Sequence, residues 1–341
     1  MPIKRHRKIH RPSGNRSYRE EREVLGKMLF PYENVVFEGG GVHGLAYIAN
    51  MLYMDEIGVY TSVKRWAGSS VGTLMATCGA CHLSPQLLMS DTRTLTKDIL
   101  TGGVCFARAL VNFAVKWGLY DIRASFYPWL VNLLQRHLHD SVEDVSRMTF
   151  GDVQRIFGTD LHLTTLNIET MQNCVFSSCA TPNVYVLDVV AAGMSVEVMF
   201  QPQKIRNVQG RHIDAGCTDN MPLYVFDDDQ HGGQNYYNAK TLGIRSIKDN
   251  SVFFAQPIAH TVPSPRSLKD YLENLVSLVV EAAQQRHTHL RDAERTYFMV
   301  LPRSINSLDF NISDEDRDRM QQIGYEGMKQ YLQEKCEEKE F

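Results

Sequence analysis

The sequence lacks an apolar segment near its N-terminus. The first 30 residues contain no hydrophobic stretch of the signal-peptide type. Elsewhere no run of 18 or more apolar residues occurs, because charged side chains such as Arg108, Asp188 and Glu197 interrupt the longest candidates. We therefore expect an intracellular chain without a transmembrane helix, located in the cytoplasm or peripherally on a membrane.

The cysteines do not follow a disulfide or metal-binding pattern. Their number, seven, is odd, and the CxxC pair Cys78 and Cys81 has no second pair at zinc spacing. We interpret this pair as small buried residues on a helix. The sequence therefore predicts no metal, no cofactor and a reducing compartment.

Excess charge of one sign is confined to the N-terminus. Net charge is −3, but residues 1–22 hold eight Lys or Arg against two Glu, a local charge of +6. The remaining body is acidic, so we expect no nucleic-acid partner. Residues 1–30 are predicted to form a basic, disordered arm. Its run Lys4–Lys8 is open to three interpretations: an anionic-lipid contact, a nuclear localisation signal, or a solubilising tail.

The rest of the 341-residue chain, residues 31–341, is long enough for one large domain. Its first part repeats one pattern: an apolar strand at 35–37 precedes a helix at 45–54, and a strand at 63–67 precedes a helix at 73–81. Two strand–turn–helix units in 50 residues predict an α/β fold with a parallel sheet. We place the motif-bearing core at 33–226 and C-terminal strands and helices at 227–341.

Further elements follow from the hydrophobic pattern. Residues 99–140 carry apolar and aromatic side chains at helical spacing, typical of either a helical cap over a site or ordinary core. Strands are predicted at 161–165, 174–176 and 183–186, and long helices at 267–286 and 314–335.

The first motif is the glycine-rich run Gly39–Gly44, between a predicted strand and a predicted helix. Consecutive glycines present bare N–H groups near a helix N-terminus, which suits an anion. The run satisfies GxGxxG for a dinucleotide, and it also suits an oxyanion hole for acyl transfer. Dinucleotide binding needs a carboxylate after the second strand. That strand ends Trp66-Ala67-Gly68, so the oxyanion hole is favoured.

The second motif is Gly68-x-Ser70-x-Gly72, at the predicted junction of a strand and a helix. A nucleophile on such a strained turn needs small residues two positions to either side. The turn would place the Ser70 hydroxyl at a helix N-terminus.

The third motif is Asp214-Ala215-Gly216, followed by Asn220 and Pro222. A serine nucleophile needs a base, and Asp214 ends a predicted strand as the other motifs do. His212 lies two residues earlier on the same face, and is interpreted as a strand residue in preference to a third catalytic group.

Together these motifs resemble the patatin-like phospholipase family over about residues 33–335. The resemblance implies a three-layer α/β/α fold with a mostly parallel central sheet and a Ser–Asp dyad. By that resemblance, Ser70 is the nucleophile, Asp214 is the general base, and Gly39, Gly40 and Gly41 form the oxyanion loop. The motif is completed by supporting glycines at Gly44, Gly68, Gly72 and Gly216.

The sequence departs from the family at His43, where many relatives have Arg or Lys; we predict His43 as a substrate contact. Gly193 and Glu197 also stand where the family normally has Ser and Pro. The expected activity is calcium-independent lipid acyl hydrolysis of the phospholipase A or lysophospholipase type, on a lipid or phospholipid substrate and with peripheral membrane contact. The alternatives are a catalytically idle lipid-binding scaffold and a nucleotide-dependent oxidoreductase.

Overall fold

A computed structural model describes residues 30–227, 237–248, 290–302 and 304–337, with scattered residues between 267 and 279. The predicted arm therefore lies outside the described residues except for Phe30, and most of the predicted helix at 267–286 does too. The strands are β1 (Asn34–Phe37), β2 (Arg65–Gly68), β3 (Gly118–Tyr120), β4 (Asp160–Asn167), β5 (Gln172–Phe176), β6 (Val198–Phe200), β7 (His212–Ile213), β8 (Thr241–Lys248) and β9 (Thr296–Leu301).

The α-helices are α2 (Gly44–Glu56), α3 (Val71–Ala80), α4 (Pro85–Asp91), α5 (Lys97–Thr101), α6 (Phe106–Lys116), α7 (Phe126–Leu138), α8 (Phe150–Phe157), α9 (Val186–Gly193), α11 (Leu290–Ala293) and α12 (Asp314–Glu337). Short 3-10 helices are η1 (Gly41–His43), η2 (Tyr60–Ser62), η3 (Thr92–Thr94), η4 (Val145–Arg147) and η5 (Leu223–Phe226).

The central sheet has the strand order β5-β4-β2-β1-β8-β9, and β7 also pairs with β4. Strands β4, β2, β1, β8 and β9 run parallel, whereas β5 and β7 run antiparallel to β4. Strands β3 and β6 form a separate parallel pair. The predicted mostly parallel sheet is confirmed.

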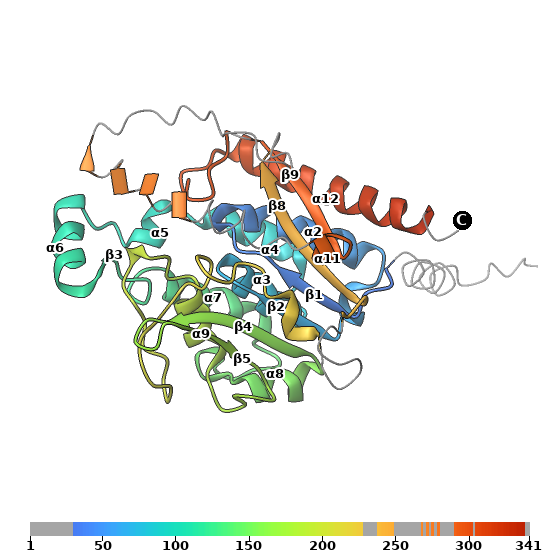
Figure 1. The fold of residues 1–341 in the computed structure, drawn as a ribbon, viewed down its shortest axis with the longest axis horizontal. Coiled ribbons are helices and arrows are strands. Elements are labelled where there is room, and N and C mark those ends of the chain that lie inside the picture. Colours follow the sequence, from blue (N-terminus) through green and yellow to red (C-terminus); the bar gives the residue numbers. More distant parts are fainter. Residues whose placement is uncertain are drawn as a thin grey trace, which may run out of the picture.

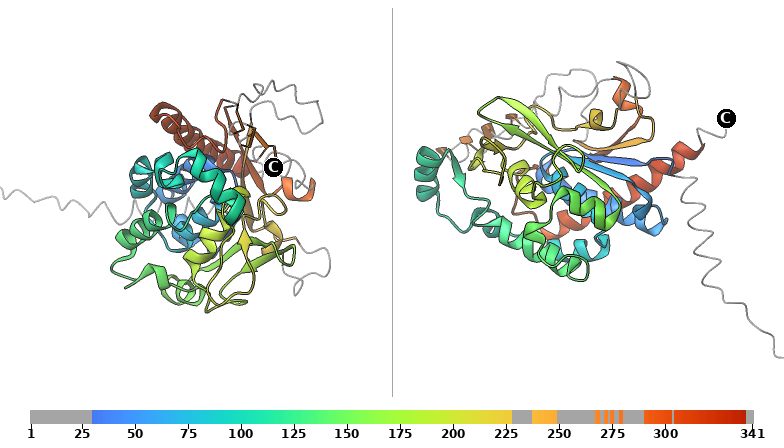
Figure 2. Two further views of the ribbon diagram at one scale, coloured as in Figure 1. Left: turned by 90° about the vertical axis from the view of Figure 1, so that its left-hand side faces the viewer. Right: turned by 90° about the horizontal axis from the view of Figure 1, so that it is seen from below.

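Helices flank this sheet, as Figure 1 shows. Helices α2 and α12 pack on each other, α3 packs against β1, β2 and β4, and α9 packs against β4. In the right-hand view of Figure 2 the strands are seen nearly edge-on, with α12 passing beside them. On the other face, Leu223 and Phe226 of η5 pack against Val36 and Ala67. The α/β fold class is therefore confirmed.

The interior explains why β1 and β2 lie at the centre of the sheet. All four residues of β1 are buried, and Phe37 stacks on Trp66 of β2 with ring centroids 6.1 Å apart. A Cβ at Gly79 would lie 2.5 Å from the Trp66 ring, so glycine lets α3 approach the sheet closely. Nearby, Cys78 and Cys81 are buried, and burial raises the pKa of the Cys78 thiol to about 12. Their interpretation as core residues is confirmed, and all seven cysteines are free.

One predicted strand, at 183–186, is wrong. Only Tyr185 makes an isolated bridge, to Thr149, and Val186 already begins α9. Every residue of α9 is buried. Residues 183–185 precede α9, and Val184 and Val186 are buried whereas Asn183 is exposed, so this turn has the alternating pattern of a strand.

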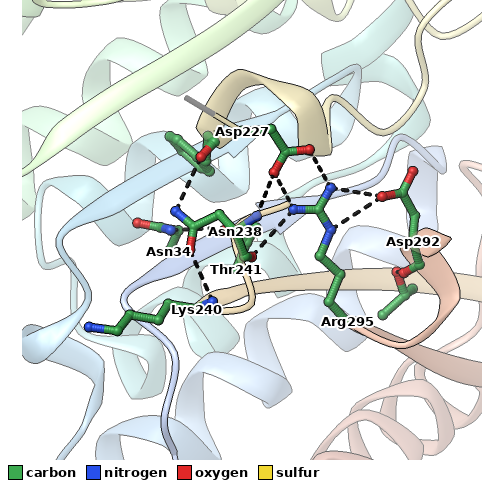
Figure 3. Close-up of polar contacts among 9 residues, drawn as sticks. Asn34, Asp227, Asn238, Lys240, Thr241, Asp292 and Arg295 are labelled. Carbon is green, nitrogen blue, oxygen red and sulfur yellow. Dashed lines mark hydrogen bonds and ion pairs between the residues drawn. The ribbon is translucent and has the colours of Figure 1, made fainter. Parts of the chain in front are cut away.

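An ion-pair cluster joins segments at the amino ends of β1, β8 and β9 (Figure 3). Arg295, 1% exposed, donates to Asp227 at 2.6 Å and to Asp292 at 2.7 Å. Close by, the Asn34 amide donates to the Thr241 hydroxyl at 3.0 Å. The Arg295 cluster stabilises the sheet at the edge opposite to the sequence motifs.

Strand register brings the three motifs together at the carboxyl edge of the sheet. Phe37 of β1 pairs with Gly68 of β2, so the glycine loop and the Ser70 turn leave the sheet side by side. Gly68 in turn pairs with Leu163 of β4, and Ile213 of β7 pairs with Leu166. Because β7 runs antiparallel to β4, its end carries Asp214 back toward this edge. Such edges are the usual ligand sites of open α/β sheets.

Candidate active site

Ser70 lies on a sharp turn between β2 and α3. Its backbone has φ 52° and ψ −129°, a conformation that costs a non-glycine residue about 1–3 kcal/mol. A Cβ at Gly68 would lie 2.1 Å from the Gly72 carbonyl oxygen, and one at Gly72 would lie 2.3 Å from the Phe37 carbonyl oxygen. The turn therefore requires glycine at both flanking positions, as predicted, and it presents Ser70 at the N-terminus of α3.

Asp214 lies against Ser70 at the end of β7. Its carboxylate accepts a hydrogen bond from the Gly216 backbone N–H at 2.7 Å, and it lies close enough to the Ser70 side chain for that side chain to lower its pKa. The residue is 2% exposed, and its own N–H donates to the Ser195 carbonyl oxygen at 3.0 Å. The two predicted catalytic residues thus lie next to each other in the wall of one cavity.

The surroundings of Asp214 make it a stronger base than an exposed carboxylate. Burial raises its pKa to about 8, and the nearby Glu197 carboxylate acts in the same direction. The Ser70 side chain and the hydrogen bond from Gly216 oppose this rise, since they stabilise the charged form. A carboxylate with a pKa in this range is suited to take a proton from a serine hydroxyl near neutral pH.

The glycine loop runs beside Ser70. A Cβ at Gly39 would lie 2.6 Å from the Ser70 Cβ, and one at Gly41, where φ is +55°, would lie 1.9 Å from the Ser307 carbonyl oxygen. The Gly39 N–H donates to the Asn220 carbonyl oxygen at 3.0 Å. Gly39 therefore differs from the prediction: its amide is already engaged, and its role is close approach.

Gly40 and Gly41 suit the oxyanion role better. Both line the same cavity as Ser70. The Gly41 N–H begins η1 and, like other first-turn amides, has no intrahelical acceptor. Backbone amides at this end of the cavity, beside Ser70, would stabilise a negative charge that forms there.

A buried network holds this loop in place. The Asn220 amide donates to the Gly39 carbonyl oxygen at 3.1 Å. Asn220 also lies near Glu38 and lowers its pKa, and the Glu38 carboxylate lies 3.1 Å from Arg245 Nε. Burial raises the pKa of Glu38 to about 7 against the opposing effect of Arg245. Asn220 thus connects the third motif to the first.

His43 is placed differently from a substrate contact. It is 4% exposed, its Nδ1 lies 2.9 Å from the Ser246 hydroxyl, and it does not line the cavity that holds Ser70. Burial lowers its pKa to about 4, so the ring is neutral at pH 7. His43 therefore supplies no positive charge at this loop position, and it does not reach the cavity.

His212 is not part of the dyad. Its Nδ1 lies 2.9 Å from the Thr165 hydroxyl, and its Nε2 lies 3.2 Å from the Gln209 carbonyl oxygen. Its ring packs against Phe176, with centroids 5.8 Å apart. Both ring nitrogens are occupied away from Ser70, as expected for a strand residue.

An apolar cavity extends from the dyad. The 99–140 region, predicted as either a cap or ordinary core, contributes to its wall, while others of its side chains, such as Leu130 and Leu133, belong to the core. The side chains of this region that line the cavity are Leu100, Ile122, Phe126 and Trp129. Leu308, Phe310 and Ile312, from the segment before α12, line it as well. Such a cavity suits a hydrocarbon chain.

Two charged residues in the cavity wall were missed as site residues. Glu197 precedes Val198, a β-branched residue with φ 68°, a strained conformation. Glu197 lines the cavity together with Cys217. Arg317, on α12, also lines the cavity. No sequence signal marks Arg317, since it lies 103 positions from Asp214 on another element. Glu197 does carry a signal, because it departs from the family pattern.

The model of a family described as patatin-like phospholipase matches residues 35–227, more than half of the chain. No curated protein matches it. Among solved structures, VipD from Legionella pneumophila is similar with a TM-score of 0.56 and 15% identity, over 89% of this chain and 67% of VipD.

A structure of the ExoU–SpcU complex from the type III secretion system of Pseudomonas aeruginosa also matches, with a TM-score of 0.51 and 18% identity. The match covers 90% of this chain and 52% of the other. This chain therefore spans about two thirds of the first relative and about half of the second. At these identities the likeness shows a common fold.

Proposed function

The chain belongs to the patatin-like phospholipase family, and on this premise we propose that it hydrolyses carboxylic esters of lipids by a Ser70–Asp214 dyad. The observation that carries the proposal is that Ser70 lies next to the buried Asp214 carboxylate, beside the glycine loop. The apolar cavity that begins at Ser70 supports a lipid acyl chain as the bound group.

Each step of the reaction has a group in place. Ser70 Oγ attacks the acyl carbonyl carbon while Asp214 takes the hydroxyl proton, and the oxyanion is stabilised by the amides of Gly40 and Gly41. Protonated Asp214 then gives this proton to the leaving alcohol, and an acyl-enzyme remains. A water molecule, deprotonated by Asp214, attacks the acyl carbon and releases the fatty acid and Ser70.

This chemistry needs no metal, and the described residues hold no group of three His, Cys, Asp or Glu that suits one. We expect fatty acid release from a phospholipid or a short-chain ester to continue with EDTA in excess over calcium. Complete loss with EDTA and recovery with calcium would contradict the mechanism. A folded protein that cleaves no ester with or without EDTA would favour the idle lipid-binding scaffold.

The Glu197→Gln variant is expected to change the pH dependence of this reaction. The base acts when Asp214 is deprotonated, so kcat/KM should rise with pH through the pKa of about 8. Because the Glu197 charge disfavours the charged form of Asp214, its removal lowers that pKa and moves the rise to lower pH. A pH profile between 5 and 9 measures this. The exposed Glu143 serves as the matched control in Glu143→Gln, and an unmoved profile in Glu197→Gln would contradict the assignment.

We further propose that helix α6 contacts a membrane surface. Residues Lys97–Lys116 are long and apolar enough to cross a membrane by length and composition, and 17% of the tested window is buried. They are divided between α5 and α6 at Gly102 and Gly103, both at positive φ. Figures 1 and 2 place α6 at one extremity of the described molecule. The division and this position favour a helix that lies on a bilayer.

The composition of α6 favours an anionic bilayer. Val111, Val115 and Trp117 are 62%, 71% and 55% exposed. Basic residues accompany them: Arg108 and Lys116 lie on the helix, and the Arg211 guanidinium stacks 4.4 Å from the Trp117 ring. A helix with exposed apolar side chains and flanking cations binds in the interface of anionic lipids. Leu100 and Ile122, on either side of α6 in the chain, line the cavity, so such contact would bring lipid to the site.

Replacing Val111 and Val115 together by Asp is expected to weaken binding to anionic vesicles by about 10-fold or more, since two buried valines are lost from the contact. Cosedimentation with phosphatidylserine-containing vesicles, in a Ser70→Ala background that leaves the lipid intact, measures this. Leu87 on α4 is 55% exposed, and Leu87→Asp is the matched control. Equal binding by the α6 variant and the control would exclude this helix as the contact.

A further inference from the structure

Arg317 is the one Lys or Arg among the described residues that line the cavity. It is 5% exposed, and it lies in the first part of α12, next to the apolar side chains of Phe310 and Ile312 that share the cavity wall. A buried guanidinium in such surroundings is costly unless it is paired. A partner for the Arg317 guanidinium is therefore expected nearby.

Its partners among the described residues are few. Nη1 donates to the Thr92 carbonyl oxygen at 2.7 Å. Nε is buried and has no hydrogen-bond acceptor within the described part of the chain. The nearest carboxylate, Asp314, lies 3.7 Å from Nε, and its side chain is 81% exposed. An ion pair with such an exposed partner is weak, since water screens it.

The neighbouring charges do not supply a better partner. Arg93 on η3 is a second cation nearby, and it donates to Asp318 at 2.5 Å outside the cavity lining. The other carboxylates that line the cavity, Asp214 and Glu197, belong to the catalytic end. His43, where a loop cation was expected, is neutral and directed elsewhere. Arg317 thus remains a buried cation facing a space that, by the proposed function, receives a lipid.

We propose that Arg317 binds an oxyanion group of the lipid, and that the preferred substrates are therefore esters that carry an anionic group. A guanidinium recognises phosphate and carboxylate alike, through two parallel hydrogen bonds. A glycerophospholipid supplies a phosphate, and a lipid ester with a free carboxyl group supplies a carboxylate, for which a fatty acid serves as the binding probe. The inference rests on the proposed function only in taking the cavity as a lipid site.

The test measures binding, so that it does not depend on hydrolysis. Ser70→Ala protein is titrated calorimetrically with three single-chain lipids of the same acyl length, each below its micelle concentration: a lysophosphatidic acid, a fatty acid and a neutral monoacylglycerol. Charged hydrogen bonds contribute ~1.5–3 kcal/mol, so Arg317→Gln should weaken binding of the anionic lipids by about 10-fold or more. The monoacylglycerol should change by less than about 2-fold. Arg317→Lys should lose less than Arg317→Gln, and Arg93→Gln is the matched control with little effect.

The outcomes separate the alternatives. A loss confined to the lysophosphatidic acid identifies phosphate as the group bound, and a loss confined to the fatty acid identifies carboxylate. Equal loss for the monoacylglycerol means that Arg317 only supports the cavity wall, and it overturns the proposal. If Arg317→Gln does not fold, parent protein that binds the anionic and neutral lipids equally overturns it as well. A further outcome is anion binding that depends on Arg317 together with no ester cleavage by the protein that retains Ser70. It would leave this inference standing and refute the proposed hydrolase.

Discussion

Replacing Ser70 by Ala, or Asp214 by Asn, is expected to reduce kcat/KM for ester hydrolysis by at least about 10⁴-fold, since either change removes a member of a unit that acts together. Alanine has no nucleophile, and the asparagine amide cannot take the serine proton. The double variant should be no worse than the worse of the two single variants. Fatty acid release from one phospholipid and one short-chain ester, assayed in parallel, measures this.

The stability of the two variants provides the control. The pKa of Asp214 is raised by folding from about 3.8 to about 8, so the folded state holds a proton that the unfolded state releases, and this residue lowers stability as pH rises through that interval. Asp214→Asn removes the effect. Thermal unfolding should show it gaining stability relative to the parent between pH 5 and pH 9, with Ser70→Ala folded throughout. Folded variants that retain full activity would refute the dyad.

Gly39→Ala is expected to reduce kcat by about 10²–10³-fold, the effect of losing an oxyanion donor. The added methyl group would lie 2.3 Å from the Asn220 side-chain oxygen and 2.6 Å from the Ser70 Cβ. These contacts force the glycine loop away from the nucleophile, and with it the amides of Gly40 and Gly41. The same ester assays measure the effect, which should fall mainly on kcat because the acyl cavity is not altered.

A matched substitution is Gly151→Ala on α8, where the nearest atom to the added Cβ is the Pro182 carbonyl oxygen at 3.1 Å. Gly151 is not among the residues that line the cavity with Ser70. Activity should therefore stay within about 2-fold of the parent, as for most changes away from a functional site. A Gly39→Ala protein that is as active as Gly151→Ala would show that the loop does not depend on close approach.

The parts of the site that local sequence determines could be predicted. A strained turn between a strand and a helix needs glycine on both sides of Ser70, and that requirement is visible in five consecutive residues. Strand β1 and the helix after it could be predicted in the same way, because an apolar run followed by consecutive glycines is compatible with few other structures. Parallel register then brings these motifs to one edge of the sheet without further information.

The parts that depend on distant residues could not be predicted. The Gly39 amide is engaged by Asn220, 181 positions away along the chain, and no spacing rule indicates such a contact. Likewise the raised pKa of Asp214 comes first from burial by surrounding segments and then from the carboxylate of Glu197, which precedes β6. The wrong strand at 183–186 has a related cause: Val184 and Val186 alternate as in a strand, whereas hydrogen bonds with Phe150 and Met148, more than 30 positions away, hold this segment as a turn before α9.

In the proposed mechanism Ser70 forms a covalent acyl-enzyme with the help of Asp214. The most direct measurement treats the protein with an alkyl fluorophosphonate, which captures activated serine nucleophiles, and locates the adduct by peptide mass spectrometry. One adduct is expected, on Ser70, which forms much more slowly in Asp214→Asn and is absent from Ser70→Ala. Folded protein that binds lipid but gains no adduct, or gains it on a residue other than Ser70, would refute the proposed mechanism.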